Sequence, residues 1–508
     1  MINYISEKQI SIEEFKTPFQ AELSADNRWV KLASVVPWDS FANLYISLMS
    51  PKHGRPGISP RIILGALIIK HKENLSDEKT ILAIQENVYM QFFVGLKGFQ
   101  TKMIFDPSLF VSIRKRIGKK EFDALNVQLI KSLSNRTDQK NIDKKSDSDK
   151  YPPNKGKMQA DATVADQYIT FPTDAKLLNS SRKHLDDMID KLYYYHGKNM
   201  NKPRTYKHVL NKAFLSYSKK KNKSKSRHRK MKRKLLESVK RNIKFVKVLL
   251  PDPDVLVLGK DYPLTKKDLS LFKIIQEVYL QQQQMYDQKT NSIPNRIVSL
   301  YQAHVRPILR GKQNARVEFG SKLGVSLDNG FAFLNTLSWD AYHEGKDLIP
   351  QVEFYYKTHG YYPDLVQVDK AYSTRENRKW LKERGIRITA KALGRKPKQK
   401  KTAYQKVKHK REAAERNHIE AKFGQGKNAY NLNKIRAKLK TTSESWVSCI
   451  FFVMNLMNAL KKNIFWAIFN QFIWTNRRYS KNKGRLKNCL HNLYQNVRKS
   501  EINIAYLY

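Results

Sequence analysis

Three acidic residues of this chain lie in surroundings that do not favour an acid: two among apolar residues and one among basic residues. Asp161 lies in MQADATV among small and apolar residues, Asp369 ends the apolar run LVQVD, and Glu420 is the one acid in the basic stretch RNHIEAKFGQGK. Carboxylates that converge can hold two divalent ions, of which one activates an attacking oxygen and the other stabilises a leaving oxygen. Mg²⁺ prefers such oxygen ligands and keeps several waters, so two or three side chains suffice. The three acids therefore predict a site for metal-assisted phosphoryl transfer.

Each acid also has a purely structural interpretation, which the residues alone leave open. Each aspartate can be a satisfied core or turn residue, and Glu420 can pair with Arg416, four positions earlier, on a solvated helix face. A helical rotation of about 100° per residue places Arg416, Glu420 and Lys427 within about 40° of one another. Gly424 and Gly426 weaken a continuous helix here.

The charge of the chain indicates a polyanionic partner. The sequence has 96 Lys and Arg against 45 Asp and Glu, a net charge of +51 over 508 residues. Nucleic acid is the first candidate for a partner of such a chain. Residues 219–234 hold eleven Lys or Arg and no acid. They suit a solvated, self-repelling segment, but with this net charge we favour a surface that contacts phosphates.

The sequence does not favour a membrane or an oxidising compartment. Its first residues lack the basic start and apolar run of a signal peptide. The most apolar stretch, 446–460, is too short for a membrane span and contains two Asn, so we expect a buried helix. Cys449 and Cys489 are the only cysteines, which argues against a disulfide framework and a structural zinc site. We expect a soluble, cytoplasmic protein.

The elements that must position the acids follow from periodicity and turn signals. Residues 30–135 read as helical, with Ser59 and Pro60 at one helix start. Short helices of this kind suit a helix-turn-helix reader of DNA as well as any small bundle. Strand patterns occupy 158–174, 316–339, 364–372 and 385–390, with an Asn-Gly hairpin signal at 329–330. Helical patterns flank these strands, which indicates an α/β class with a mixed sheet.

Taken together, these segments resemble the DDE-type transposases of bacterial insertion sequences. Arg416, Glu420 and Lys427 match the spacing of the last three residues in the tyrosine–arginine–glutamate–lysine signature of a large group of them. Asp161 in DATV, followed by FPTD, and Asp369 in VDKAYSTRENR resemble the segments that carry the two catalytic aspartates. VRPILRGK, VEFGSKLGVS, NLNKIRAKL and the N-terminal GRPGISPRIILGALIIKH also resemble segments of this group. The resemblance covers about residues 30–460.

The chain departs from this group at two places. The tyrosine of the signature falls on Ala413, so its role is absent or filled elsewhere. The distance from Asp161 to Asp369 is 208 residues, whereas that from Asp369 to Glu420 is 51. An insertion therefore precedes the second aspartate.

The resemblance implies an RNase H-like catalytic domain behind a helix-turn-helix-like domain that binds transposon ends. The implied divisions are a helical domain at 1–135, a linker at 136–157, a catalytic domain at 158–460 with a helical basic insertion at 178–300, and a basic, aromatic tail at 461–508. The implied catalytic and metal-binding residues are Asp161, Asp369 and Glu420, and the implied DNA-binding residues are Arg416, Lys427, Lys370 and Lys422.

These residues would bind two Mg²⁺, with Mn²⁺ as a substitute, cut DNA at terminal inverted repeats and join the 3′-OH to target DNA. We expect a homodimer, because two ends are joined together. Three rivals remain: a metal-dependent nuclease on the same fold, an inactive transposase that only binds DNA, and a basic packager of nucleic acid. The packager has no use for the acids, whereas the nuclease uses all three.

Overall fold

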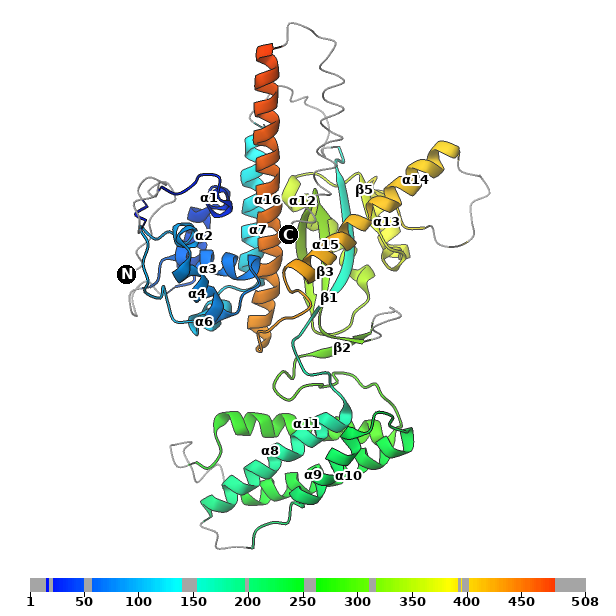
Figure 1. The fold of residues 1–508 in the computed structure, drawn as a ribbon. Coiled ribbons are helices and arrows are strands. Elements are labelled where there is room, and N and C mark those ends of the chain that lie inside the picture. The colour runs from blue at the N-terminus through cyan, green and yellow to red at the C-terminus, as the bar shows by residue number, and fades with distance from the viewer. Residues whose placement is uncertain are drawn as a thin grey trace. The chain divides into compact units, whose positions relative to one another are not determined.

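The computed structural model describes residues 15–17, 22–49, 57–138, 153–196, 201–250, 262–309, 317–391, 394 and 402–479. Its contacts divide the chain into a large unit, Met1–Asn455, and a smaller one, Leu456–Tyr508. Figure 1 shows three groups of elements in the large unit: N-terminal helices in blue, a mixed sheet with its own helices, and a second helical group in green.

The N-terminal group is helical, as expected. Its helices are α1 (Arg28–Ala33), α2 (Trp38–Ser47), α3 (Pro60–Lys72), α4 (Asp77–Glu86), α5 (Val88–Phe93), α6 (Leu109–Arg116) and α7 (Lys119–Asp138). Helix α3 begins where the sequence predicts, with Ser59 before it and Pro60 as its first residue. Side-chain caps begin the next two helices: Ser76 accepts from the Lys79 N–H, and Asn87 accepts from the backbone of α5. Most of the predicted linker, 136–157, lies outside the described residues.

Five strands of a six-stranded mixed sheet lie in the predicted strand regions, whereas the strand at 306–309 was not predicted. The strands of the sheet are β1 (Lys157–Asp166), β2 (Arg306–Leu309), β3 (Val317–Asp328), β4 (Phe331–Ser338), β5 (Leu365–Val368) and β6 (Arg387–Ile388). Their order is β2-β3-β1-β5-β6, and β4 also pairs with β3. Strand β1 runs antiparallel to β3 and parallel to β5, and β6 is parallel to β5. The strand that carries Asp161 is therefore paired on both sides.

The hairpin between β3 and β4 turns at the predicted place. Asn329 and Gly330 both have positive φ angles, 48° and 81°, as a tight hairpin turn requires. Strand β4 pairs with Lys322–Asp328 of β3, while β2 pairs with the beginning of β3.

Helices cover both faces of the sheet. Successive side chains of β1 point to opposite faces, so each face offers side chains for a helix to pack against. Met158 and Ala160 pack in one cluster with Leu348 and Val352 of α12 (Leu348–His359). On the opposite face, Gln159 donates to the backbone oxygen of Glu415, the last residue of α14 (Ala403–Glu415). Helix α15 (Asn417–Ala429) also contacts β1. The face of β1 that bears Asp161 is therefore the face toward α15.

The apolar stretch 446–460 lies in α16 (Lys440–Tyr479), and it is buried as expected. Asn455 is buried there and exchanges two hydrogen bonds with the backbone of Ala332 in β4, at 2.8 and 2.7 Å. Its amide also donates to Asn126 of α7 at 2.9 Å. None of the helices in the described residues is long and apolar enough to cross a membrane. Part of the predicted tail is helical, since α16 continues to Tyr479, and residues 480–508 lie outside the described residues.

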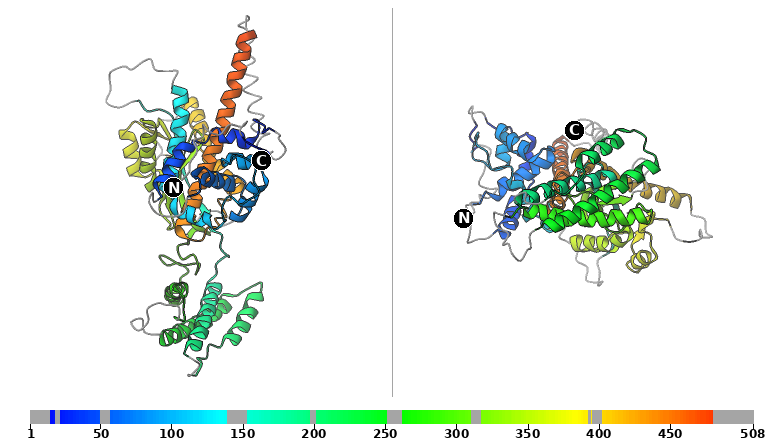
Figure 2. Two further views of the ribbon diagram at one scale, coloured as in Figure 1. Left: turned by 90° about the vertical axis from the view of Figure 1, so that its left-hand side faces the viewer. Right: turned by 90° about the horizontal axis from the view of Figure 1, so that it is seen from below.

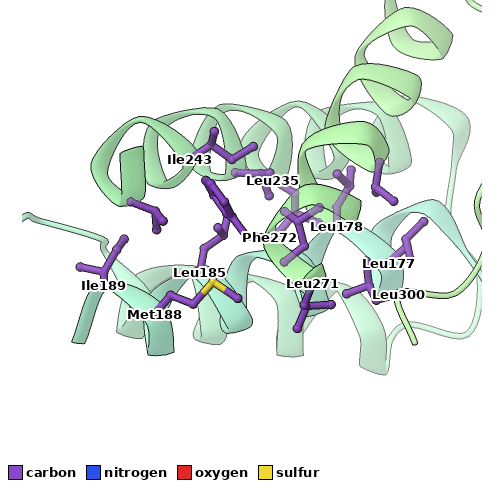
Figure 3. Packing of buried hydrophobic residues seen from close by; sticks show 14 of the residues in the cluster. Leu177, Leu178, Leu185, Met188, Ile189, Leu235, Ile243, Leu271, Phe272 and Leu300 are labelled. Atoms are coloured by element: carbon purple, nitrogen blue, oxygen red, sulfur yellow. The ribbon is translucent and has the colours of Figure 1, made fainter. Parts of the chain in front are cut away.

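The insertion between β1 and β2 is a helical unit with a core of its own. It contains α8 (Asp174–Tyr195), α9 (Lys207–Lys219), α10 (Lys225–Leu249) and α11 (Lys266–Asp287), which pack together in both views of Figure 2. Figure 3 shows Leu185 of α8, Leu235 of α10 and Phe272 of α11 turned toward one another. The basic segment 219–234 spans the exposed turn between α9 and α10 and the first part of α10.

Candidate active site

Asp161 lies in the middle of β1 with its carboxylate mostly enclosed, at 17% side-chain exposure. One oxygen accepts a hydrogen bond from the Ala162 N–H at 2.8 Å, and the other lies 3.3 Å from a guanidinium nitrogen of Arg416. Burial raises the pKa of this carboxyl to about 6, although the Ala162 N–H and Arg416 oppose the rise. The charges of Glu344 and Asp369 add to it. Burial is therefore the main reason that the charged form of Asp161 is unfavourable here, and the two neighbouring acids are smaller contributions.

Asp369 is brought beside Asp161 by strand pairing. Strands β1 and β5 are parallel, and Ala160 pairs with Val368. Asp161 and Asp369 are the next residues of the two strands, so they leave the paired region side by side. Asp369 is exposed, and its carboxylate accepts from the Lys370 N–H at 2.6 Å at the start of the short helix η3 (Lys370–Tyr372).

Glu420 reaches the same place from α15. Ile419 and Phe423 are buried and anchor the helix, while the Glu420 side chain is 54% exposed. Arg416 precedes the first turn of α15, and its guanidinium lies 2.9 Å from a carboxylate oxygen of Glu420. The same guanidinium contacts Asp161, so Arg416 joins the two acids. Helix α15 is continuous through Gly424 and Gly426, contrary to the weakness that these glycines indicate.

The three acids fit a divalent cation by their chemistry, and Arg416 occupies the space between two of them. Carboxylate oxygens are the ligands that Mg²⁺ prefers, and burial raises the pKa of Asp161 even though Arg416 lies beside it. In the described residues, no three His, Cys, Asp or Glu side chains lie close enough to hold one ion. In this arrangement Asp161 and Glu420 share the Arg416 guanidinium as their counter-ion.

The four predicted DNA-binding residues do not all lie beside the three acids. Lys427 lies on α15 but pairs with Glu318 of β3, at 3.6 Å, rather than with the acids. Lys370 is exposed directly after Asp369, and Lys422 is half-buried on α15. Ala413, at the position of the signature tyrosine, is exposed on α14 and offers no hydroxyl there.

Sequence reasoning missed the polar residues that hold these elements in place. Gln159 and Gln367, on the paired strands β1 and β5, hydrogen-bond each other at 2.9 Å and are buried. Gln367 also donates to the Glu412 backbone and to the Glu415 carboxylate, which fastens the end of α14 to the sheet. A polar residue within an apolar strand was the signal available for both glutamines. Glu344, whose charge adds to the raised pKa of Asp161, was not singled out from the sequence either.

Comparisons with known proteins show which family the chain belongs to. A family model described as "Transposase DDE domain" matches residues 366–457, which include Asp369 and Glu420, and one described as "Transposase domain (DUF772)" matches residues 17–116. The chain is 30% identical, over 163 residues, to the "Uncharacterized protein ORF8 in nfe locus" of Rhizobium meliloti. That match covers 32% of this chain and 73% of the relative. No solved structure matches. The chain belongs to the DDE-type insertion-sequence transposases.

Proposed function

We propose that the chain cuts DNA at the terminal inverted repeats of an insertion sequence and joins the freed 3′-OH to target DNA. Asp161, Asp369 and Glu420 are the catalytic residues of this proposal. The observation that carries it is their convergence: two lie side by side on parallel strands, and the third shares Arg416 with the first. The segments that meet are separated by up to 259 positions in the sequence.

The strand order supports an RNase H-like sheet for the catalytic domain. Strands β4, β3 and β1 are successive antiparallel neighbours, and β5 and β6 follow parallel to β1. This is the arrangement expected of that fold, with the insertion lying between the first and second core strands. We retain 158–460 as the catalytic domain, with 1–135 as the helix-turn-helix-like domain that binds the element's ends.

Chemistry at the site divides between the acids and the cations. Two divalent ions, Mg²⁺ or Mn²⁺, would supply activation of the attacking oxygen and stabilisation of the leaving oxygen. Binding of these ions by Asp161 and Glu420 would compete with Arg416 for their oxygens, and a released Arg416 would have its guanidinium available for a DNA phosphate. Lys370, Lys422 and Lys427 are the further phosphate contacts that we propose.

The same acids serve two successive reactions. Water first hydrolyses a phosphodiester at the element's end, leaving a 3′-OH. That 3′-OH then attacks a phosphodiester of the target, so one bond forms as another breaks. Because two ends are joined, the active complex is a homodimer on double-stranded DNA in the cytoplasm, and the net charge of +51 favours its association with DNA.

Cleavage of a labelled duplex that carries the element's terminal repeat tests the proposal. Wild type is compared with Glu420→Gln, which keeps the side-chain shape and removes its charge, and with Glu237→Gln on α10 as a matched control. We expect cleavage with Mg²⁺ by wild type and the control, and none by Glu420→Gln, while all three bind the duplex. Equal cleavage by Glu420→Gln would remove Glu420 from the site.

The products of this reaction separate the rival functions. Joined products support the transposase, and cut but unjoined DNA supports a metal-dependent nuclease. Binding without cleavage by wild type supports an inactive DNA-binding descendant, which Ala413 at the signature tyrosine position favours.

A further inference from the structure

A second short turn lies against the turn that follows Asp369. The helix η2 (Glu344–Asp347) connects β4 to α12. Asn377, which is buried, donates one hydrogen bond to the Gly345 oxygen at 2.7 Å and another to the Tyr372 oxygen at 2.9 Å. A Cβ atom on Gly345 would lie 3.0 Å from the Ala371 oxygen. Asn377 and this close approach hold Glu344 near the Asp369 turn.

The other end of η2 is fixed to the sheet by Asp347. This carboxylate accepts from the hydroxyls of Thr336 in β4 and Tyr342. It lies directly over Gly324, where a Cβ atom would collide with it, and Gly324 pairs with Ala162 in β1. The hydrogen bonds of Asp347 therefore attach η2 to the sheet at the level of Ala162, the residue that follows Asp161.

Glu344 differs from Asp347 because it is held by a cation rather than by hydroxyls. A Glu344 oxygen lies 2.9 Å from Lys322 Nζ, and its side chain is 27% exposed. Lys322 also donates to the Tyr342 oxygen at 2.8 Å. Lys322 is thus the counter-ion of Glu344, just as Arg416 is the counter-ion of Asp161 and Glu420.

A buried hydroxyl without a partner points to a missing ligand at this cluster. Tyr372 has 0% exposure, and its hydroxyl has no hydrogen-bond partner among the described residues. Burial, followed by the charges of Glu344, Asp161 and Asp347, raises the pKa of this hydroxyl, which places it among the acids. An unpaired buried hydroxyl is unfavourable, and a water held by a bound cation would satisfy it.

We propose that Glu344 is a fourth acidic residue of the metal site, which binds a divalent cation directly or through water beside Asp161 and Asp369. The inference rests on the proposed function, since it adds a ligand to the same site. Lys322 is the counter-ion of Glu344 when no metal is bound and competes with the metal for it. The Tyr372 hydroxyl donates a hydrogen bond to one of the water or carboxylate oxygens that surround the cation.

Direct measurement of Mn²⁺ binding to the full-length chain tests this role without relying on activity. Free Mn²⁺ is followed by electron paramagnetic resonance as protein is added, in the absence of DNA. We expect Glu344→Gln to weaken binding by at least about tenfold, the lower end of the loss found even for outer partners of metal ligands. Lys322→Met should strengthen binding, a change in the opposite direction that misfolding would not produce. Glu237→Gln is the matched control and should bind as wild type does.

Asp161→Asn separates failure of this inference from failure of the proposed function. If Asp161→Asn loses Mn²⁺ while Glu344→Gln binds it as wild type does, Glu344 is not a ligand and the three-acid site stands. If Asp161→Asn and Glu344→Gln both bind Mn²⁺ as wild type does, both proposals fail.

Discussion

Asp161 carries an unfavourable charge in the metal-free protein, so its removal should stabilise the fold. Burial, the largest cause, raises the pKa of this carboxyl from 3.8 to about 6. A rise of this size lowers the stability of the folded state above pH 6 by up to about 3 kcal/mol, at about 1.4 kcal/mol per pKa unit. Asp161→Asn keeps an oxygen that can accept from the Ala162 N–H and removes the charge.

The sign of this effect sets its pH dependence. Below the unfolded-state pKa of 3.8 the carboxyl is protonated in both states and makes no difference to stability. Between that value and about 6 the folded chain binds more protons than the unfolded chain, so wild-type stability falls as pH rises. We expect the free energy of unfolding of Asp161→Asn to be higher than that of wild type by up to about 3 kcal/mol at pH 8. At pH 5 the difference should be about half as large.

Urea unfolding of both proteins at the two pH values, without metal, measures this difference. Asp340→Asn is the control because its carboxylate is 70% exposed and 3.7 Å from Arg306; it should change stability by no more than about 0.5 kcal/mol at either pH. Adding Mg²⁺ at pH 8 should stabilise wild type more than Asp161→Asn. The reasoning fails if Asp161→Asn is less stable than wild type at pH 8, or if the difference does not depend on pH.

Three further changes test other parts of the structure. Asn455→Leu leaves the backbone groups of β4 unpaired and should lower the free energy of unfolding by about 2–4 kcal/mol, measured by urea unfolding; an unchanged value would contradict the buried hydrogen bonds. Gly324→Ala pushes a methyl group into the carboxylate that fixes η2, so it should lower stability by about 1–3 kcal/mol and weaken Mn²⁺ binding; normal binding would show that η2 does not position the site. Lys219→Gln, Lys220→Gln and Lys221→Gln together remove exposed charges from the insertion and should reduce the slope of log affinity for DNA against log salt by up to about 3; an unchanged slope would exclude this turn from the DNA contact.

Elements with a local signal were predictable from the sequence. The Asn-Gly pair set the hairpin at 329–330, and Ser59 with Pro60 marked the start of α3. The apolar residues around Asp161 and before Asp369 marked two buried strands, and Asp161 is mostly enclosed whereas Asp369 is exposed.

Contacts between distant segments were not predictable, because no local pattern encodes which partner a side chain meets. Helical rotation placed Arg416, Glu420 and Lys427 on one face, and the first two do pair. Lys427 instead reaches Glu318 on β3, since the sheet packs against this helix. Arg416 also spans to Asp161, 255 positions away.

Glu344 and Asn377 show the same limit at the site itself. Glu344 begins the short helix η2, which has no sequence motif, and the two hydrogen bonds of Asn377 help to hold this helix beside the turn after Asp369. The insertion is a different case, since its helical periodicity was readable but its independent core was not. That core requires α8, α10 and α11 to meet across long separations.

Joining of a pre-cut end tests the central claim most directly. A duplex that ends in the element's own 3′-OH is incubated with a plasmid target and Mg²⁺, using wild type, Asp369→Asn and a duplex whose terminal 3′-OH has been removed. We predict joined products for wild type with the intact end and none in the other two reactions. Joining by Asp369→Asn, or no joining by a wild-type protein that binds the end and the metal, would contradict strand transfer by these three acids.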